Sequence, residues 1–343
     1  MKPNKVLLVD VDSVIPNLAL MKLSTFYKSK GYAIELLRLN YDGKPGKRRR
    51  TLIRNGKFHK VFISIVFTPN KDVIKIDKPE LKNYELGGTG YDYSVKLSDE
   101  IDSQEEDYTI YPDNDEALGF ITRGCVNNCS FCFVPRKEGY LYKYRDWRQI
   151  ADTAKKYGLK KIRFLDNNFL AYPECEKVMQ ELIDNDIRCS FNEGLDFRQI
   201  TESKAKLLSQ LRYYSTEYLF AFDNISYLPL IEKKYAIIKK YIKRDWQIKF
   251  YCYVHPNMPL KDTVARLEWC RKNKALAYIM KDKECYDSPH KDFYRDLCSW
   301  SNAPGIYKNY SFTEHMLRKS KDKNRILKSV HLYQSCLEET KVL

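Results

Sequence analysis

The strongest constraint on the fold is a regular alternation of strand-like and helix-like segments. Between residues 117 and 280, short runs rich in β-branched and aromatic residues are separated by segments with apolar residues at helical spacing. The strand-like runs are 117–123, 160–166, 187–193, 217–223, 247–255 and 275–280. Because parallel strands need helical crossovers, this alternation predicts a partial (β/α)6 barrel over residues 116–300. Ligands of such sheets bind at the carboxyl ends of the strands.

A smaller α/β layer is predicted ahead of the barrel, over residues 1–98. Its strand-like runs are 5–11, 33–39 and 60–67, and its helix-like segment is 17–32. Residues 99–115 are acidic and polar, so we expect them to form a linker. Residues 301–343 are lysine-rich and are expected to form a basic tail.

The N-terminus carries no signal peptide, because Asp10 and Asp12 interrupt its short apolar run. No apolar run is long enough to span a bilayer. We therefore expect a cytoplasmic protein with no membrane partner, in which thiols stay reduced. Clustered cysteines in such a protein are more often metal ligands or catalysts than disulfide partners.

Three cysteines follow the first barrel strand within the stretch RGCVNNCSFCFVPRKEG. Cys125, Cys129 and Cys132 lie close enough in sequence to hold one compact metal centre. Iron–sulfur clusters are held by cysteine thiolates, and four irons normally take four ligands. Three ligands leave one iron open, as catalytic metal sites leave a position for substrate. The alternative, a zinc knuckle, needs four ligands, but the other seven cysteines are scattered and favour core thiols.

The spacing C-x3-C-x2-C, with Phe131 directly before the last cysteine, resembles the motif of the radical S-adenosylmethionine (radical SAM) enzymes. The resemblance covers residues 115–285, and SFCFVPRKEG is similar to a segment of methylthiotransferases and cobalamin-dependent relatives. It implies a [4Fe–4S] cluster, S-adenosylmethionine as cofactor and a reducing donor of the flavodoxin or ferredoxin type. The implied reaction is reductive cleavage of S-adenosylmethionine to a 5′-deoxyadenosyl radical, which abstracts hydrogen from a substrate.

The resemblance also implies cofactor contacts at the strand ends. The expected contacts are Phe131, Asp166, Asn167, Asn168, Asn192, Glu193, Arg198 and Asp223. Residues at the second strand end would hold the methionine amino group, although the family usually has Gly-Gly-Glu where this chain has LDNN. Those at the third would hold the ribose hydroxyls and the carboxylate. Any one of these polar residues can instead cap the helix after its strand. No catalytic acid or base is singled out.

The N-terminal domain resembles the Rossmann-like cobalamin-binding domain that precedes the barrel in one class of radical enzymes. Gly87, Gly88 and Gly90 fall where those domains place a glycine pair, which would admit a ligand or form a tight turn. The histidine motif of some cobalamin proteins is absent, and His59 is not in that context. We expect a domain that kept the fold and lost the cofactor, and therefore one that works without cobalamin. Methylthiotransferases carry three cysteines there, whereas none precedes Cys125 here.

The substrate is predicted from charge alone. The net charge is +15, and residues 43–57 hold seven basic side chains and no acid. The expected phosphate contacts are Lys47, Arg48, Arg49, Arg50 and Arg54. A second basic run covers residues 317–328. We therefore expect modification of a nucleic acid or nucleotide. The alternatives are a peptide or small metabolite, a cobalamin-dependent radical methyltransferase and a non-catalytic iron–sulfur protein.

Overall fold

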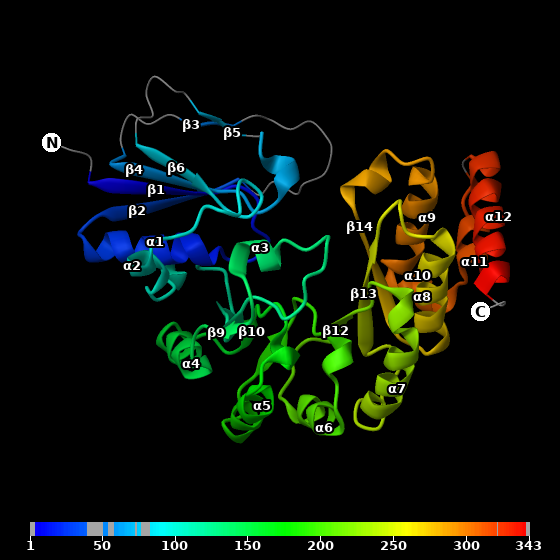
Figure 1. The fold of residues 1–343 in the computed structure, drawn as a ribbon. Helices are drawn as coiled ribbons and strands as arrows, with labels where there is room; N and C mark the ends of the chain where they lie inside the picture. The colour runs from blue at the N-terminus through cyan, green and yellow to red at the C-terminus, as the bar shows by residue number, and fades with distance from the viewer. Residues whose placement is uncertain are drawn as a thin grey trace. The chain divides into compact units, whose positions relative to one another are not determined.

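The chain divides into two compact units in the computed structural model (Figure 1). The structure describes residues 4–39, 51–53, 58–72, 74–76, 83–320 and 322–340. The first unit comprises Met1–Gly119, Asn127–Gly139 and Asp146–Ile162, and the second comprises Phe120–Val126, Tyr140–Arg145 and Arg163–Leu343. Each unit is therefore discontinuous in sequence. The expected boundaries near residues 98 and 115 do not coincide with this division.

The first unit is built on a parallel sheet with the strand order β2-β1-β4-β6. Its elements are β1 (Lys5–Asp10), α1 (Leu18–Ser29), β2 (Ala33–Arg38), β4 (Lys60–Ser64) and β6 (Tyr84–Gly87). A separate parallel pair consists of β3 (Thr51–Ile53) and β5 (Ile74–Ile76). The strands and the helix predicted before residue 68 are confirmed. α1 begins where predicted because the Asn17 side chain accepts the Leu20 N–H at 3.2 Å.

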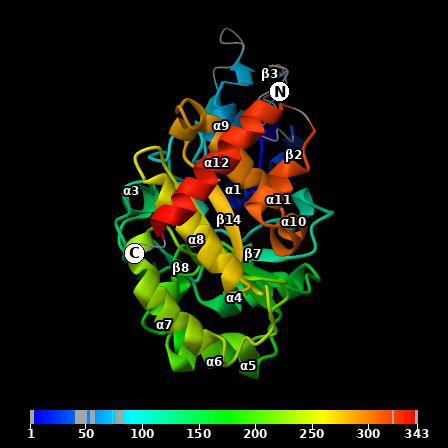
Figure 2. The same ribbon diagram turned by 90° about the vertical axis from the view of Figure 1, so that its right-hand side faces the viewer.

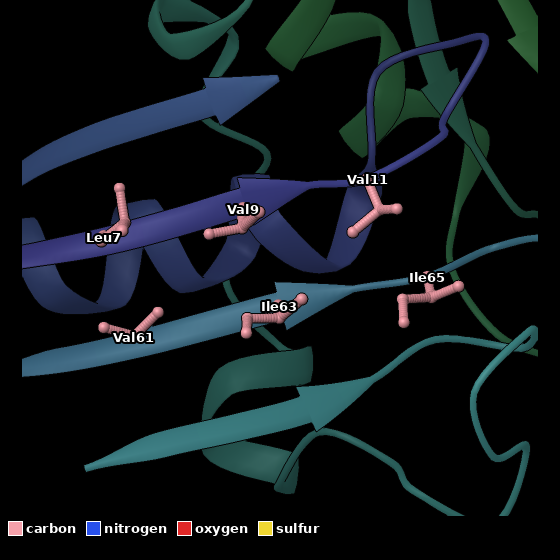
Figure 3. Close-up of a cluster of buried hydrophobic side chains, with 6 residues drawn as sticks. All are labelled: Leu7, Val9, Val11, Val61, Ile63 and Ile65. Atoms are coloured by element: carbon pink, nitrogen blue, oxygen red, sulfur yellow. The ribbon is translucent and has the colours of Figure 1, made fainter. Parts of the chain in front are cut away.

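The β1 strand is buried on both faces, as its continuous apolar run predicts. On one face, Val6 and Leu8 form a buried cluster with Leu20 and Leu23 of α1. On the other, alternate residues of β1 and β4 meet in a second cluster (Figure 3). Its members are Leu7, Val9, Val11, Val61, Ile63 and Ile65. Both faces of β1 are therefore buried in apolar clusters.

Residues 99–115, expected to form a linker, are instead a packed part of the first unit. They contain α2 (Asp99–Asp102) and the 3-10 turn η2 (Tyr108–Ile110). Asp107 is buried, accepts the Ser24 hydroxyl at 2.6 Å and pairs with Lys28 at 2.6 Å. The acidic composition suggested solvent exposure because the basic partners lie on α1, about eighty residues earlier in sequence.

The remaining elements of the first unit are β7 (Ala117–Gly119), α3 (Val134–Glu138) and α4 (Trp147–Lys156). The Ala117 N–H donates to the Lys161 carbonyl at 2.8 Å, just before β10 (Ile162–Phe164). α4 packs closely on β7, since a Cβ on Gly119 would lie 2.5 Å from Ile150 Cδ1. A side chain at this position would force the Ile150 side chain to move.

The second unit continues the alternation of strands and helices. Its strands are β8 (Thr122–Arg123), β9 (Tyr142–Lys143), β11 (Cys189–Phe191), β12 (Tyr218–Ala221), β13 (Ile248–Val254) and β14 (Leu276–Lys281), with the end of β10. The intervening helices are α5 (Cys175–Asp184), α6 (Glu202–Gln210), α7 (Leu228–Ile238) and α8 (Leu260–Lys272). β12, β13 and β14 form a parallel sheet in that order. Each predicted strand run thus contains a strand, and the predicted α/β class is confirmed.

The core of the second unit lies between its strands and helices. Phe250, Cys252 and Val254 of β13 are fully buried, while the alternating residues Tyr251 and Tyr253 are half-buried on the other face. One face of β13 is therefore fully packed, and the other face is only partly covered.

The C-terminal residues, expected to form a basic tail, fold into helices. These are α9 (Lys291–Ser301), α10 (Pro304–Asn309), α11 (Phe312–Leu317) and α12 (Lys323–Thr340). Figure 2 shows α12 running beside α8, and the Tyr333 hydroxyl of α12 donates to Glu268 of α8. Trp300, Tyr307 and Phe312 are completely buried. The abundant lysines obscured this apolar spacing in the sequence.

Candidate active site

The three clustered cysteines lie in the loop between β8 and α3. All three are half-buried. The Cys132 N–H donates to the Cys129 carbonyl at 3.0 Å, and the Val134 N–H donates to Cys132 Sγ at 3.4 Å. Hydrogen bonds to sulfur favour the thiolate that binds iron. Phe131, an expected cofactor contact, has a 39% exposed side chain.

The strand that leads into this loop is held by Asp166, directly after β10. The Asp166 Oδ1 accepts the Thr122 N–H and the Thr122 hydroxyl, both at 2.6 Å, and Oδ2 accepts the Ile121 N–H at 3.2 Å. Burial raises the Asp166 pKa to about 6, although these hydrogen bonds act in the opposite direction. Both Asp166 oxygens therefore bind Ile121 and Thr122, at the start of β8. The sequence analysis had predicted that Asp166 contacts the cofactor.

Asn168 brings a polar group next to the first cysteine. Its Nδ2 lies 3.5 Å from Cys125 Sγ and 3.5 Å from Asp196 Oδ2. The Asn168 side chain is 2% exposed, and its Oδ1 has no hydrogen-bond partner among the described residues. Burying an unsatisfied carbonyl costs about 1–3 kcal/mol, so such an atom indicates a missing donor. Asn167 is half-buried beside it.

Arg198 binds a carboxylate of the chain itself. Its Nε and Nη2 each donate to Asp196 at 2.8 Å, and its guanidinium lies 4.6 Å from the Tyr227 ring centroid. Asp196 also accepts the Arg198 N–H at 3.1 Å, at the start of the 3-10 turn η4 (Phe197–Gln199). The sequence analysis missed Asp196, which connects Asn168 to Arg198. The Asp-x-Arg pattern at the start of η4, a few residues after β11, was the available signal.

The remaining predicted contacts follow β11 and β12. The Asn192 Oδ1 is buried and has no hydrogen-bond partner in the described part of the chain. Desolvation by the surrounding protein raises the pKa of Glu193, and the charge of Arg163 acts in the opposite direction. The Glu193 side chain is nevertheless partly exposed. Asp223 accepts the Tyr253 N–H at 2.9 Å, and burial raises its pKa. Three strand ends thus carry polar groups, as predicted.

Arg266, which the sequence analysis missed, fixes the ends of β12 and β13. It is 1% exposed and donates to the carbonyl oxygens of Phe222 at 2.8 Å and Tyr253 at 3.0 Å. An arginine in the middle of a helix normally indicates a solvated surface, so no sequence signal distinguished it. Its role here is to satisfy strand-end carbonyls.

A group of potential metal ligands at the ends of β13 and β14 is satisfied internally. One ligand atom from each of His255, Asp282 and Glu284 lies within 4.8 Å of the others. His255 Nε2 is 3.2 Å from Glu284 Oε2, and its Nδ1 accepts the Asn257 N–H at 3.1 Å. Asp282 accepts the Tyr253 hydroxyl at 2.7 Å and the Glu284 N–H at 2.9 Å. Because both ring nitrogens are engaged, we assign no metal to this group.

The basic residues predicted to contact phosphate cannot be placed in the same way. Lys47, Arg48, Arg49, Arg50 and Arg54 lie outside the described residues. Part of the second basic run, by contrast, is used inside the fold. Arg325 and Lys319 both pair with the buried Asp296, which also accepts the Ser329 hydroxyl at 2.8 Å.

Comparison with known proteins places the cysteine loop and the following strands in one family. Residues 120–203 match the model of the radical SAM superfamily. This segment of the chain is therefore similar to a radical SAM domain. This family implies a [4Fe–4S] cluster and S-adenosylmethionine, and it supports an enzyme. The comparison with curated proteins finds no match.

The fold is similar to that of one solved radical SAM methyltransferase, and a second solved structure gives a weaker match. The radical S-adenosylmethionine methyltransferase TsrM from Kitasatospora setae, with tryptophan substrate and the analogue aza-SAM bound, has a TM-score of 0.57 at 11% identity. The match covers 80% of this chain and 72% of TsrM. SuiB from Streptococcus suis, bound to S-adenosylmethionine, has a TM-score of 0.36 at 12% identity, over 49% of this chain and 40% of SuiB. The radical SAM domain and the TsrM likeness fit the predicted partial barrel.

The membrane prediction was examined on the helices of the described residues. None of them combines the length and the apolar character that a bilayer crossing requires.

Proposed function

We propose that the chain is a radical SAM enzyme in which Cys125, Cys129 and Cys132 hold a [4Fe–4S] cluster. When bound, the cluster supplies the electron for reductive cleavage of S-adenosylmethionine, which yields the hydrogen-abstracting radical. The observation that carries the proposal is the position of Asn168, whose buried amide lies 3.5 Å from Cys125 Sγ and keeps one oxygen for a ligand. A flavodoxin- or ferredoxin-type protein is the proposed reductant.

The residues present fit the cluster. Three half-buried thiols follow one another in a single loop, and two of them already accept nitrogen donors, from Val134 and Asn168. Structural zinc requires four ligands in a closed tetrahedron. The cluster with an open iron needs only the three that this loop supplies.

The residues present also fit S-adenosylmethionine. Two buried side-chain oxygens that find no partner within the described residues, Asn168 Oδ1 and Asn192 Oδ1, are hydrogen-bond acceptors. The methionine ammonium and the ribose hydroxyls of S-adenosylmethionine are donors. We therefore propose that Asn168 receives the amino group and that Asn192, with Glu193, receives the ribose. Phe131, Asn167, Arg198 and Asp223 stay predicted contacts of the same cofactor.

Anaerobic turnover tests the proposal. The chain is reconstituted with iron and sulfide, reduced with dithionite and incubated with S-adenosylmethionine, and 5′-deoxyadenosine is measured by mass spectrometry. We expect four irons and four sulfides per chain and release of 5′-deoxyadenosine. One equivalent of zinc without acid-labile sulfide would contradict the cluster. A four-iron cluster without 5′-deoxyadenosine, with all substrate classes present, would favour a non-catalytic iron–sulfur protein.

We propose a nucleic acid or nucleotide as the substrate, supported by the seven basic residues between positions 43 and 57. If these side chains neutralise phosphates, affinity for RNA or DNA falls with salt, with a log–log slope of about −0.7 to −0.9 per phosphate. The triple substitution Arg48→Ala, Arg49→Ala, Arg50→Ala should flatten this slope by up to about three such increments. An unchanged slope would leave these arginines as solvated surface.

The second candidate is modification of a small molecule or peptide, including methyl transfer. It is supported by the fold likeness to TsrM, a methyltransferase whose structure holds tryptophan. Incubation with tryptophan and S-adenosylmethionine labelled in the methyl group should then give a labelled product. Label recovered in RNA instead would favour the first substrate class. A specific relation to methylthiotransferases stays a prediction.

A further inference from the structure

The glycine-rich loop at residues 85–92 packs against the chain rather than opening toward a ligand. Gly88 has a φ of +98°, and a Cβ there would lie 2.2 Å from the Ile65 carbonyl oxygen. A Cβ on Gly90 would lie 2.5 Å from the Phe67 carbonyl carbon. The Gly90 N–H also donates to the Ile65 carbonyl at 2.9 Å. The two glycines therefore fix Thr89 against the segment that leaves β4.

Thr89, held in this way, contacts the helix that follows the cysteines. The Lys137 ammonium of α3 donates to Thr89 Oγ1 at 2.8 Å. Arg136 of α3 lies 5.5 Å from the ring centroid of Tyr93, just beyond the same loop. α3 has only five residues, so its own hydrogen bonds are too few to stabilise it in isolation. Contacts of this kind fix its position.

The position of α3 in turn determines a hydrogen bond to a cluster ligand. Val134, the first residue of α3, donates its N–H to Cys132 Sγ at 3.4 Å. Hydrogen bonds to ligand sulfurs tune the reduction potential of iron–sulfur clusters and orient the ligands. A continuous set of contacts therefore runs from the exit of β4, through Thr89 and Lys137, to Cys132.

We propose that Thr89 and Lys137 are positioning residues for the cluster, and that the glycine-rich loop serves this role in place of ligand binding. The inference rests on the proposed function, because it assumes that Cys132 binds iron. Loss of the Lys137–Thr89 contact would let α3 shift and weaken the N–H donation to Cys132 Sγ. The cluster would then differ in potential and would release iron faster, while the fold of the unit would persist.

The test compares Thr89→Val and Lys137→Met with wild type in the full chain. Thr109→Val is the matched control, because Lys28 Nζ lies 2.8 Å from Thr109 Oγ1 in the same unit, away from α3. Thr89→Ser keeps the hydroxyl and should restore wild-type behaviour. The measurements are the midpoint potential and electron paramagnetic resonance spectrum of the reduced cluster, the rate of iron loss to a chelator, and thermal unfolding of the cluster-free chain.

We expect Thr89→Val and Lys137→Met to shift the midpoint potential and to speed iron loss about threefold to tenfold, which is the size of effect expected for one ordinary hydrogen bond. Thr89→Ser and Thr109→Val should match wild type in both measurements. Potentials and iron-loss rates equal to wild type in Thr89→Val would overturn this inference alone. A wild-type chain that takes up no iron–sulfur cluster would overturn the proposed function as well.

Discussion

The carboxyl ends of the parallel strands differ between the two units in how their polar groups are satisfied. In the first unit, Asp12 follows β1 and accepts the N–H groups of Val66 at 2.7 Å and Phe67 at 2.9 Å, and the Asn70 amide at 2.9 Å. Asn17 donates to Ser64 Oγ at 2.8 Å and to Ser13 Oγ at 3.0 Å. Donors and acceptors at this edge pair with one another.

In the second unit, two side-chain oxygens that follow β10 and β11 accept no hydrogen bond from the described residues. Asn168 Oδ1 and Asn192 Oδ1 are buried, and neither has a hydrogen-bond partner within the described ranges. Buried polar groups in native proteins are nearly always satisfied, so these oxygens point to a ligand that supplies donors.

The difference shows that strand topology alone does not make a binding site. The order β2-β1-β4 places a switch point between β1 and β4, where open α/β sheets commonly bind ligands. Here Asp10 accepts the Tyr111 hydroxyl at 2.9 Å and the Ser13 N–H at 3.0 Å. Residues outside the sheet therefore make the hydrogen bonds that a ligand would otherwise make. A ligand site needs polar atoms that the chain leaves unpaired.

The largest expected effect comes from the three cysteines in the loop between β8 and α3. Replacing Cys125, Cys129 or Cys132 with alanine should remove nearly all iron and all release of 5′-deoxyadenosine, because three ligands are the minimum for this cluster. Iron and sulfide analysis after anaerobic reconstitution measures the effect.

Cys252→Ala provides the control, since Cys252 is fully buried in β13. This variant should keep its iron and lose only modest stability through a small cavity. Equal iron loss in Cys252→Ala and Cys129→Ala would show that the cysteines act through folding and not as ligands.

The sequence allowed prediction of the features that depend on local patterns. Strand and helix periodicity located a strand in each of the six predicted runs, although not β9, and the spacing of the three cysteines predicts a cluster. The missed features depend on contacts between distant residues. Asp107 looked like part of a solvated linker because Lys28 and Ser24 are far away in sequence. For the same reason, no local pattern indicated that Asp166 would bind Thr122.

The next largest effect concerns Asp166, whose two carboxylate oxygens both accept hydrogen bonds from the chain. Its pKa rises from 3.8 to about 6, so the folded chain binds the proton more tightly than the unfolded chain. The associated stability is present below pH 4 and is lost as pH rises through 6, by about 3 kcal/mol in total. The free energy of unfolding of wild type relative to Asp166→Asn should therefore increase from pH 7 to pH 4. A pH-independent difference would mean that the carboxylate stays charged.

A smaller effect should distinguish Asn168 of the second unit from Asn17 of the first unit. Asn168→Ala should weaken S-adenosylmethionine binding about tenfold, because one charge-assisted hydrogen bond is lost. Asn17→Ala should leave that affinity unchanged and should lower the free energy of unfolding by about 1–3 kcal/mol, since it removes an N-cap and two side-chain hydrogen bonds. Calorimetric titration and denaturant unfolding of both variants measure the contrast. The reverse pattern would exchange the roles assigned to the two regions.

The last prediction is the absence of an effect: the first unit should not bind cobalamin. Asp12, which follows β1 at the switch point, is already paired, since it is 2% exposed and accepts three donors. A cofactor there would have to break these hydrogen bonds, each contributing about 1 kcal/mol, before gaining any of its own. Hydroxocobalamin added to the reconstituted chain and removed by desalting should therefore leave no corrin absorbance. Retention of one equivalent would show that this edge opens on binding, and it would favour methyl transfer through cobalamin over direct hydrogen abstraction. Asp12→Ala sharpens the test: it should destabilise the first unit, because the backbone N–H groups of Val66 and Phe67 lose their acceptor. Corrin retention in this variant alone would show that the pairing of Asp12 excludes the cofactor.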